Sequence, residues 1–310
     1  MELRSPASTD EALRWLLAST STIDTPATRA RLAPAALERA FERGHRRPDL
    51  VWAATEGEQM LGLVAARDFG QTRLIDVLAL PDDAAATRAL LTRATEWALP
   101  SGEAEVSFGG PASHPLEDAR VRSVLEPLTA LGWRLLVTRR HYELPSAALA
   151  PRATPGLRIE RASPGDEDRL RFLLEHVLTD SLDVRDQRSV EELGIEGAAR
   201  HLAHELLEEP IDCIRFAVNE HPGGGVRDLG MASWLALPSG YGVLLQVGVA
   251  SWARGRGLGR DLVAAATADL LASGAHTLIA DTDDANTPMQ RAFQAEGWRP
   301  TESRIDLELA

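Results

Sequence analysis

Residues 247–260 read VGVASWARGRGLGR, an apolar segment that leads into an arginine- and glycine-rich turn. Gly255, Gly257 and Gly259 stand at alternate positions, and glycine tolerates the backbone angles at which successive N–H groups point into a turn. A helix that begins near Gly259 would add the positive end of its dipole at the same point. The stretch therefore predicts a strand, a backbone cradle for an anion such as a pyrophosphate, and a helix.

A glycine-rich turn alone is weak evidence for this interpretation. Similar spacings occur in loops that bind nothing, and the dinucleotide-binding fingerprint also places glycines between a strand and a helix. That fingerprint requires the pattern G-x-G-x-x-G, which the chain lacks. A second pattern supports the cradle, because residues 286–298 read NTPMQRAFQAEGW and follow the turn by about one strand and one helix.

Together the two patterns resemble the Gcn5-related N-acetyltransferase (GNAT) superfamily. In that superfamily an R/Q-x-x-G-x-G/A turn binds the pyrophosphate of coenzyme A (CoA), and here Arg254, Gly257 and Gly259 match it. A later asparagine in the superfamily begins a helix that ends at Gly-Phe or Gly-Trp. The residues that match this second pattern are Asn286, Phe293, Gly297 and Trp298.

The resemblance implies a CoA site in the C-terminal half of the chain. In the superfamily the strand before the turn diverges from its neighbour, its main chain pairs with the pantetheine arm, and an N–H group near the position of Val249 stabilises the oxyanion. The alternatives are a solvated helix residue for Arg260 and a pure helix-capping role for Asn286. The implied CoA-binding residues are Val247, Gly248, Val249, Arg254, Gly255, Arg256, Gly257, Leu258, Gly259, Arg260, Asn286 and Phe293.

The ends of the two halves of the chain repeat each other at an offset of 165 residues. An interval of this length predicts two copies of one domain rather than a solenoid. The alanine- and proline-rich residues 148–155 predict a linker, so we expect domains at 1–147 and 156–310. The repeated residues are Ala130, Gly132, Trp133, Arg134, Arg139, Glu143 and Leu144, which recur as Ala295, Gly297, Trp298, Arg299, Arg304, Glu308 and Leu309.

The expected fold class is α/β (α+β), with two tandem GNAT-fold domains that each have a mixed, mostly antiparallel central sheet flanked by helices, as the resemblance implies. In the C-terminal half, apolar periodicity predicts strands at 157–160, 213–219, 229–237, 243–249, 277–280 and up to 309, and helices at 166–178, 190–207, 258–271 and from 288. In the N-terminal half it predicts strands at 50–54, 59–67, 73–80 and near 105 and 135, and a helix at 84–97.

The N-terminal copy lacks the glycine turn. Residues 80–86 read LPDDAAA, and the carboxylates of Asp82 and Asp83 suit the start of a helix as well as a phosphate would. The same carboxylates would repel a phosphate. We therefore expect that the first domain does not bind CoA, and that its role is structural, with a separate ligand site as the alternative.

The chain departs from the pattern of the superfamily at the proton donor. Many relatives carry a tyrosine on the helix after the asparagine, and this chain has Phe293 at that position. Tyr241, at the start of the strand before the cradle, is the candidate donor, with a role as a turn aromatic as the alternative.

The general base is equally unusual. Gln246 stands where relatives often have a glutamate, and an amide does not accept a proton at neutral pH. The candidates for deprotonation through water are Asp281 and Asp283, expected at the end of the next strand, or an acid of residues 175–212. That region is rich in aspartate and glutamate, so it would attract a cationic amine, or it forms solvated helix faces.

Composition argues against several other classes of function. A net charge of −13 argues against nucleic acid as a partner. No apolar run approaches the ~18 residues of a membrane span and no secretory leader is recognisable, so we expect no membrane partner and a cytoplasmic location. Cys213 is the single cysteine, which excludes an internal disulfide and favours a buried apolar role. His201 and His204 lack the order of a zinc motif, so no metal is expected.

These features predict an acyltransferase that moves an acetyl group from acetyl-CoA, its co-substrate, to a primary amine. The preferred acceptor is a small cationic metabolite or antibiotic. The expected partners are acetyl-CoA and the amine, bound by a monomeric pseudo-dimer or a homodimer. The alternatives are an N-terminal acetyltransferase of peptides or proteins, and a CoA-binding regulatory module without catalysis, which Phe293 and Gln246 would fit.

Overall fold

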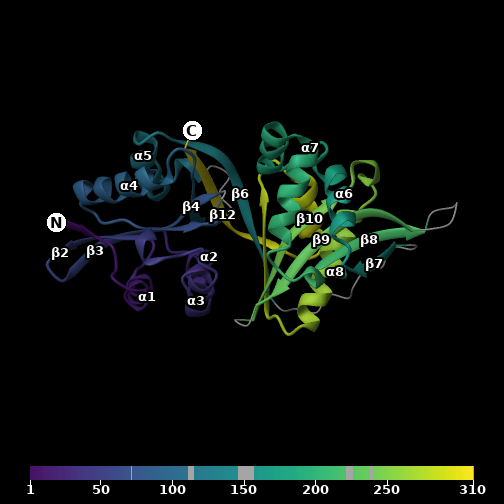
Figure 1. Cartoon of the computed structure of the whole chain (residues 1–310), viewed down its shortest axis with the longest axis horizontal. Coiled ribbons are helices and arrows are strands. Elements are labelled where there is room, and N and C mark those ends of the chain that lie inside the picture. Colours follow the sequence, from purple (N-terminus) through teal and green to yellow (C-terminus); the bar gives the residue numbers. More distant parts are fainter. Residues whose placement is uncertain (71, 111–114, 146–156, 221–225, 238–239, 310) are drawn as a thin grey trace. The chain divides into compact units, whose positions relative to one another are not determined.

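The computed structural model describes residues 1–70, 72–110, 115–145, 157–220, 226–237 and 240–309 (Figure 1). The chain divides into two compact units: Met1–Arg140 with Thr301–Ala310 form unit 1, and His141–Pro300 form unit 2. The predicted linker at 148–155 lies outside the described residues, and the predicted domain limits stay a prediction.

Two strands contribute residues to both units. The first, β6 (Trp133–Pro145), belongs to unit 1 up to Arg140 and to unit 2 from His141. The second, β12 (Arg299–Leu309), belongs to unit 1 from Thr301. There it pairs antiparallel with β5 (Glu103–Gly109). The end of the chain therefore completes the sheet of the N-terminal unit, while the last residues of the first copy, from His141 on, belong to the second unit.

Unit 1 is a sheet with helices on both faces. Its other elements are β1 (Glu2–Arg4), α1 (Thr9–Ala18), α2 (Pro26–Arg31), α3 (Pro34–Glu42), η1 (Pro48–Leu50), β2 (Val51–Glu56), β3 (Gln59–Asp68), β4 (Arg73–Ala79), α4 (Ala84–Ala98), η2 (Pro115–Glu117) and α5 (Ala119–Ala130). The strand order is β1-β2-β3-β4-β5-β12 and then β6, with β4 and β5 parallel. Leu16 of α1 and Leu37 of α3 pack on one face, and Leu90 of α4 and Val124 of α5 pack on the other.

Unit 2 repeats this arrangement. Its other elements are β7 (Leu157–Arg161), α6 (Glu167–Leu178), α7 (Val184–Leu206), η3 (Ile211–Cys213), β8 (Ile214–Glu220), β9 (Val226–Ala236), β10 (Tyr241–Val249), η4 (Ser251–Ala253), α8 (Leu258–Ala272), β11 (Thr277–Asp283) and α9 (Thr287–Ala295). The strand order is β6-β11-β10-β9-β8-β7. Leu174 of α6 and Ala199 of α7 share a core with Phe216 of β8, whereas Leu270 of α8 and Phe293 of α9 belong to the core on the other face.

Each sheet is mixed and mostly antiparallel, as predicted. The antiparallel pairs are β1–β2, β2–β3, β3–β4 and β5–β12 in unit 1, and β7–β8, β8–β9 and β9–β10 in unit 2. The one parallel pair among the described registers of unit 2 joins β10 to β11, and its last partners are Val243 and Ile279. A β-bulge at Leu245 interrupts the pairing of β10 with β9. The rest of β10 therefore continues without a registered partner in β11.

Some element limits differ from the sequence prediction. Cys213 lies in the turn η3 instead of in the strand that follows it. The helix α7 begins at Val184, earlier than predicted, and is broken at Gly194, whose φ of 70° is not helical. The strand β11 continues to Asp283, three residues beyond the predicted limit, and the two candidate aspartates lie in its last three residues. Among the described residues, no helix has both the length and the apolar character needed to cross a membrane.

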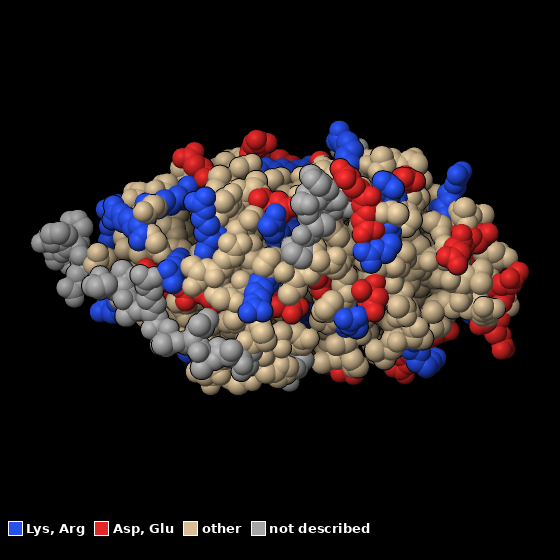
Figure 2. All heavy atoms as spheres, turned by 180° about the vertical axis from the view of Figure 1, so that it is seen from behind, with Lys and Arg blue, Asp and Glu red and all other residues tan. Residues whose placement is uncertain are grey.

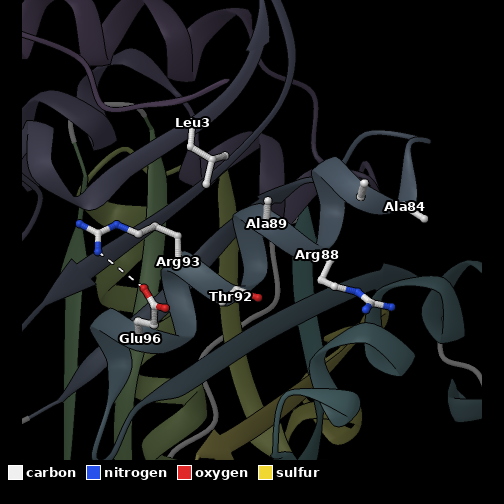
Figure 3. Close-up of a pocket in the computed structure, with 8 residues that line it drawn as sticks. Leu3, Ala84, Arg88, Ala89, Thr92, Arg93 and Glu96 are labelled. Carbon is white, nitrogen blue, oxygen red and sulfur yellow. Dashed lines mark ion pairs between the residues drawn. The ribbon is translucent and has the colours of Figure 1, made fainter. Parts of the chain in front are cut away.

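The surface of the described residues carries charges of both signs and a hollow in unit 1. Basic and acidic side chains are interspersed over the face drawn in Figure 2. The hollow, of about 630 Å³, lies in unit 1 between Leu3 and the exposed side of α4, where Arg88, Thr92 and Glu96 line it (Figure 3). None of the residues predicted from the sequence to bind CoA or to catalyse lines this hollow.

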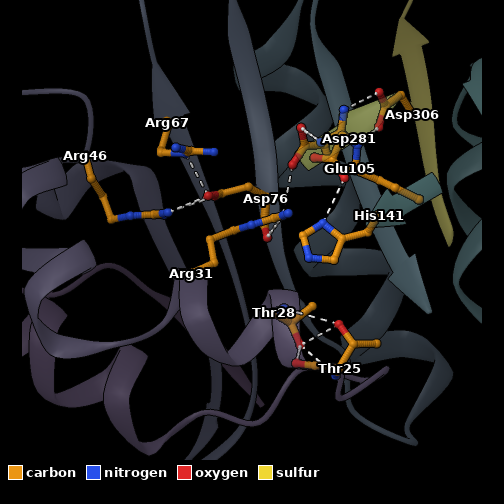
Figure 4. A network of polar contacts seen from close by, with 11 residues as sticks. Thr25, Thr28, Arg31, Arg46, Arg67, Asp76, Glu105, His141, Asp281 and Asp306 are labelled. Carbon is orange, nitrogen blue, oxygen red and sulfur yellow. Dashed lines mark hydrogen bonds and ion pairs between the residues drawn. The ribbon is translucent and has the colours of Figure 1, made fainter. Parts of the chain in front are cut away.

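A buried ion network occupies the bulge of β4 in unit 1 (Figure 4). Nη2 of Arg46 donates to both carboxylate oxygens of Asp76 at 2.8 Å, and Nε of Arg67 lies 2.8 Å from the same carboxylate. Burial alone would raise the pKa of Asp76, but the charges of Arg46, Arg67 and Arg31 outweigh it and hold the pKa below its ordinary value. The carboxylate is therefore ionised and balances the positive charges of Arg46 and Arg67.

Asp76→Asn is expected to lower the free energy of unfolding by about 3–5 kcal/mol, because it leaves the Arg46 charge buried without its counter-ion. A carboxyl group whose pKa is lowered by folding stabilises the fold at pH values above its unfolded-state pKa. This contribution is lost as the pH falls toward the folded-state pKa. The stability of the wild type should therefore decline below about pH 4, and that of the variant less steeply. Urea denaturation at several pH values measures both effects.

The matched control is Asp49→Asn, because Asp49 pairs with Arg47 on the surface and its side chain is 69% exposed. This change should alter stability by less than about 0.5 kcal/mol. Equal losses in the two variants would contradict the importance assigned to the buried network.

Candidate functional site

The predicted anion cradle is a sharp turn between η4 and α8. Gly255 and Gly257 have φ angles of 78° and 84°, and a Cβ atom added to either would meet no atom within 4 Å. Gly257 is the N-cap of α8, and no side chain caps this helix. The N–H of Arg260 donates to the carbonyl of Gly257 at 3.0 Å, so the N–H groups of Leu258 and Gly259 at the start of α8 are the ones placed to meet an anion beside the turn. The local geometry suits the anion site that the sequence predicts.

Arg254 stabilises the scaffold of the turn. Its guanidinium donates to three carbonyl oxygens: Nε to Val249 at 3.1 Å, Nη1 to Asp180 at 2.9 Å and Nη2 to Val177 at 2.7 Å. These bonds tie the end of β10 to the C-terminal end of α6, where a positive charge also complements the helix dipole. The side chain predicted to contact phosphate is thus already engaged in the structure.

The other two arginines of the turn differ from each other. Arg260 pairs with the carboxylate of Glu296 and donates from Nη2 to the carbonyl of Ala295 at 3.2 Å. Arg256 is exposed, and Nη2 makes one long hydrogen bond, of 3.3 Å, to the carbonyl of Trp252. Of the three, Arg256 is therefore best placed to swing toward an anion, which the sequence could not distinguish.

The end of β10 leads directly into the turn. Its predicted pantetheine-binding residues Val247, Gly248 and Val249 pair with β9 on one edge and lie beyond the last partners in β11 on the other. Gly248 is required by packing, since a Cβ atom there would lie 2.4 Å from Cγ1 of Val177 on α6. A ligand that enters between β10 and β11 would therefore meet the main-chain groups of residues 247–249.

The second sequence pattern forms a helix whose two matched side chains have different roles. Asn286 is the N-cap of α9, and its Oδ1 accepts a hydrogen bond from the N–H of Met289 at 3.2 Å. Phe293 is 2% exposed and lies in the core, with its ring centroid 4.9 Å from that of Tyr142 and 5.2 Å from that of Trp298. The structure therefore argues against the predicted contact between Phe293 and the cofactor.

Tyr241 lies too far along β10 for the proton transfer expected of it. It begins the strand at the end where β10 and β11 are paired, opposite Thr277. Val247 follows six residues later, so at ~3.3 Å per residue the two are roughly 20 Å apart. The tyrosine ring lies beside His276, with 6.1 Å between centroids, which fits the alternative of a turn aromatic.

Asp283 also has a structural role. Its side chain is buried, at 1% exposure for the residue, and Oδ2 accepts a hydrogen bond of 2.8 Å from the N–H of Val184. That N–H belongs to the first turn of α7, which Asp183 caps as well. The carboxylate anchors the helix to the end of β11, and this engagement argues against a role as general base.

Asp281 has a partner that the sequence did not predict. Its Oδ1 lies 2.9 Å from Nδ1 of His141 on β6, and the aspartate side chain is 29% exposed (Figure 4). The histidine lies 140 residues earlier in the chain, so no local pattern could associate it with this strand. Glu143, also on β6, approaches Nε2 of the same imidazole at 3.7 Å.

The acidic region at 175–212 is partly neutralised. Asp183 accepts hydrogen bonds from two N–H groups of α7, Asp186 accepts one from Ser181, and Glu175 and Glu192 pair with arginines one turn away. His201 lies 3.5 Å from Glu205 on the exposed side of α7. Across the described residues, no group of three histidine, cysteine or acidic side chains is arranged to hold a metal ion.

The matching position in unit 1 is closed by its own charges. Asp83 caps α4 and accepts a hydrogen bond of 2.7 Å from the N–H of Ala86, where unit 2 has the uncapped turn. Nη1 of Arg31 reaches the carbonyl of Asp76 on β4 at 3.3 Å and the carboxylate of Glu105 on β5 at 2.9 Å. In unit 1 the carboxylate of Asp83 lies at the helix start, where unit 2 has the uncapped turn. The guanidinium of Arg31 reaches both β4 and β5.

Comparisons with known proteins agree with this geometry. Residues 170–298 match the acetyltransferase (GNAT) family. A GCN5-related N-acetyltransferase from Sphaerobacter thermophilus is similar with a TM-score of 0.68 and 14% identity, over 99% of this chain and 94% of that one. A tandem GNAT protein from the clavulanic acid biosynthesis pathway has a TM-score of 0.59 and 18% identity, over 99% and 98%. No curated protein matches the sequence.

Two parallel strands that stop pairing and a glycine turn before a helix are thus found within residues that match the GNAT family. The fold of this family supports acyl transfer. Residues 170–298 therefore carry a match to the GNAT family, and the whole chain has a fold similar to that of GNAT proteins, one of them a tandem form.

Arg254→Ala should lower the free energy of unfolding by about 1–2 kcal/mol, because three carbonyl oxygens lose their charged donor. The matched control, Arg256→Ala, removes one long hydrogen bond and should stay within about 0.5 kcal/mol of the wild type. Urea denaturation of the two variants measures the difference. A larger loss for Arg256→Ala would reverse the roles assigned to these arginines.

Proposed function

We propose that this chain is an acetyl-CoA-dependent N-acetyltransferase with a single CoA site, in unit 2. The observation that carries the proposal is that two features lie on one stretch of chain: a strand that stops pairing with its parallel neighbour, and a helix start without a side-chain cap. The pairing of β10 with β11 ends at Val243, and the same strand leads to an uncapped helix behind Gly255 and Gly257. An acyl donor with a diphosphate at one end and an amide-rich arm at the other fits both features.

Each part of the co-substrate has candidate partners in unit 2. The pyrophosphate would accept hydrogen bonds from N–H groups of residues 255–259, with the Arg256 guanidinium as the mobile cation. The pantetheine arm would pair with the main chain of residues 247–249. The N–H of Val249 would stabilise the oxyanion, and a donor fixed in advance is effective in this role.

Transfer would be direct, from thioester to amine. The neutral amine nitrogen forms a bond to the carbonyl carbon, the C–S bond breaks, and the amine proton is lost as the CoA thiol is formed. Cys213 does not fit a covalent route, because burial and the neighbouring Asp212 raise the pKa of its thiol. Cys213 is half-buried in η3, short of the buried position predicted for it, and η3 is remote in sequence from the cradle.

Unit 1 would support unit 2 without binding CoA. The carboxylate of Asp83 already satisfies the start of α4, and Arg31 fills the space between β4 and β5. A phosphate at this position would meet a negative charge where unit 2 offers only N–H groups.

The acceptor we propose is a primary amine on a small cationic metabolite or antibiotic. Its support is the excess of carboxylates in unit 2 and the similarity in fold to a fungal glucosamine N-acetyltransferase region, with a TM-score of 0.65 and 14% identity over 99% of this chain and 38% of that one. An N-terminal acetyltransferase of peptides and a CoA-binding module without catalysis remain the competing proposals, and a cytoplasmic location remains a prediction.

The proposal is tested by the release of free thiol from acetyl-CoA with polyamines, amino sugars, aminoglycosides, amino acids and short peptides. Turnover with one class of amine identifies the acceptor. Stoichiometric binding of acetyl-CoA without turnover on any amine would favour the non-catalytic module.

Gly257→Asp should weaken acetyl-CoA binding by about ten-fold or more, since a side chain and a negative charge enter the cradle. Calorimetric titration measures the affinity. The control is Gly274→Asp, because Gly274 also has a positive φ, of 88°, and open space, but lies after the far end of α8. Unchanged affinity in Gly257→Asp would exclude the turn as the CoA site.

The same titration should give one acetyl-CoA per chain. The double variant Asp82→Ala with Asp83→Ala should keep this stoichiometry and the turnover rate, while losing about 1 kcal/mol of stability with the cap of α4. A second equivalent of acetyl-CoA on the wild type would show that unit 1 binds it as well.

A further inference from the structure

The strand β1 gives unit 1 an open sheet edge beside the hollow on α4. It stands at one end of the strand order, and its registered partner is β2, with Leu3 opposite Ala54. All three residues of β1 are exposed. The outer N–H and C=O groups of an end strand have no partner in their own sheet, so they can pair with a strand of another molecule.

The charged side chains of β1 have no partner in the part of the chain that the structure describes. Neither Glu2 nor Arg4 takes part in an ion pair or a side-chain hydrogen bond there. The strand at the other end of the order differs, because Glu160 of β7 pairs with Arg158 and Arg169. An end strand whose charges are satisfied within the chain discourages pairing, whereas β1 offers both of its charges to another molecule.

The sequence of β1 is complementary to itself. In an antiparallel pair of identical strands related by a two-fold axis, one residue lies opposite its own copy and sets the register. With Leu3 at the axis, Glu2 of each copy lies opposite Arg4 of the other, which gives two pairs of opposite charge. With Glu2 or Arg4 at the axis, two like charges face each other, and such registers are disfavoured. The strand therefore fits a second copy of itself in one register.

The same register brings apolar groups together. Leu3 projects to the face of the sheet that α4 covers, where it lines the hollow with Ala85 and Ala89 (Figure 3). Residues that lie opposite each other in an antiparallel pair share a face, so the two leucines stand side by side at the axis. Each leucine is 37% exposed in the single chain and would lose contact with water in the pair.

The exposed side of α4 shows a second self-complementary arrangement. Arg88 lies at one end of the hollow and Glu96 at the other (Figure 3). Arg88 has no ion-pair partner among the described residues, and Glu96, 61% exposed, reaches only Arg93 on its own helix, at 3.8 Å. A two-fold axis perpendicular to the sheet reverses the direction of α4 in the second copy, so the Arg88 end of each helix faces the Glu96 end of the other.

We propose that β1 and the exposed side of α4 form a docking surface for a second copy of this chain. The two copies pair antiparallel through β1 with Leu3 at the axis, and Arg88 and Glu96 form ion pairs across the joined hollows. A three-residue strand alone buries far less than the roughly 1,200 Å² of a stable interface, so α4 is a required part of the surface. This assignment does not depend on the function proposed for unit 2.

Sedimentation velocity of the full chain at about 1–100 μM tests the strand contact. The wild type should form a reversible dimer with a Kd of about 1–10 μM, as expected for a small interface. Glu2→Arg and Arg4→Glu should each weaken self-association by about ten-fold or more, because like charges then lie opposite each other. An equimolar mixture of these two variants should dimerise within about three-fold of the wild type, since each supplies the charge that the other lacks.

The helix contact is tested in the same way. Arg88→Glu and Glu96→Arg should each weaken self-association by about three-fold or more, and their mixture should recover it. The matched control is Glu38→Arg, because Glu38 is equally exposed to solvent but lies on α3, which packs on the other face of the sheet. Its self-association should stay within about two-fold of the wild type. All the changed residues are exposed, and circular dichroism checks that each variant is folded.

The mixtures decide between this surface and any other. Recovery in the mixture of Glu2→Arg with Arg4→Glu would support the antiparallel register centred on Leu3. A wild type that remains monomeric up to about 100 μM would overturn the proposal and leave the edge of β1 to a strand of another protein. A dimer that tolerates all four charge reversals would also overturn it, because the two copies would then meet through a different surface.

Discussion

The candidate site of unit 2 depends on the point at which two parallel strands stop pairing. Beyond Val243 and Ile279 the main chains of β10 and β11 lose their common register, close to the bulge at Leu245. Backbone N–H and C=O groups left without a strand partner need another partner. Arg254 maintains the arrangement by joining the end of β10 to the carbonyl groups at the end of α6. The glycine turn and α8 follow directly after this anchored end of β10.

The two units share one backbone geometry but differ in the charges that the chain places at it. Both have a bulged strand beside a parallel neighbour, followed by a helix of equal length. In unit 1, Asp83 supplies the negative charge at the helix start and Arg31 the positive charge between the strands. In unit 2 the helix start is uncapped and the turn is built of glycine. In unit 1 the chain therefore supplies its own charges at the positions where unit 2 would bind those of a ligand.

The division of β6 and β12 gives each half of the chain a part in the other unit. Thr301–Leu309 complete the sheet of unit 1, and residues 141–145 belong to unit 2. The repeat places residues 141–145 in the first copy, so each copy ends in a strand that the structure assigns partly to the unit of the other.

Much of the site could be predicted because its signals are local. The glycine turn, the cap at Asn286 and the acidic start of α4 are short-range patterns, since backbone angles and helix capping depend on neighbouring residues. The sequence by itself thus predicted two copies of one fold, their mixed and mostly antiparallel sheets, and the resemblance to the GNAT family that residues 170–298 match. It also indicated, as a proposal still to be tested, which copy would bind CoA.

The tertiary structure decided what each side chain contacts. It buried Phe293 against Tyr142, placed Tyr241 at the paired end of its strand, and brought His141 to Asp281. These outcomes depend on which strand lies beside which, and on where a pair of strands separates. Such long-range pairing is set by packing across the whole unit, so a local pattern in the sequence carries no record of it.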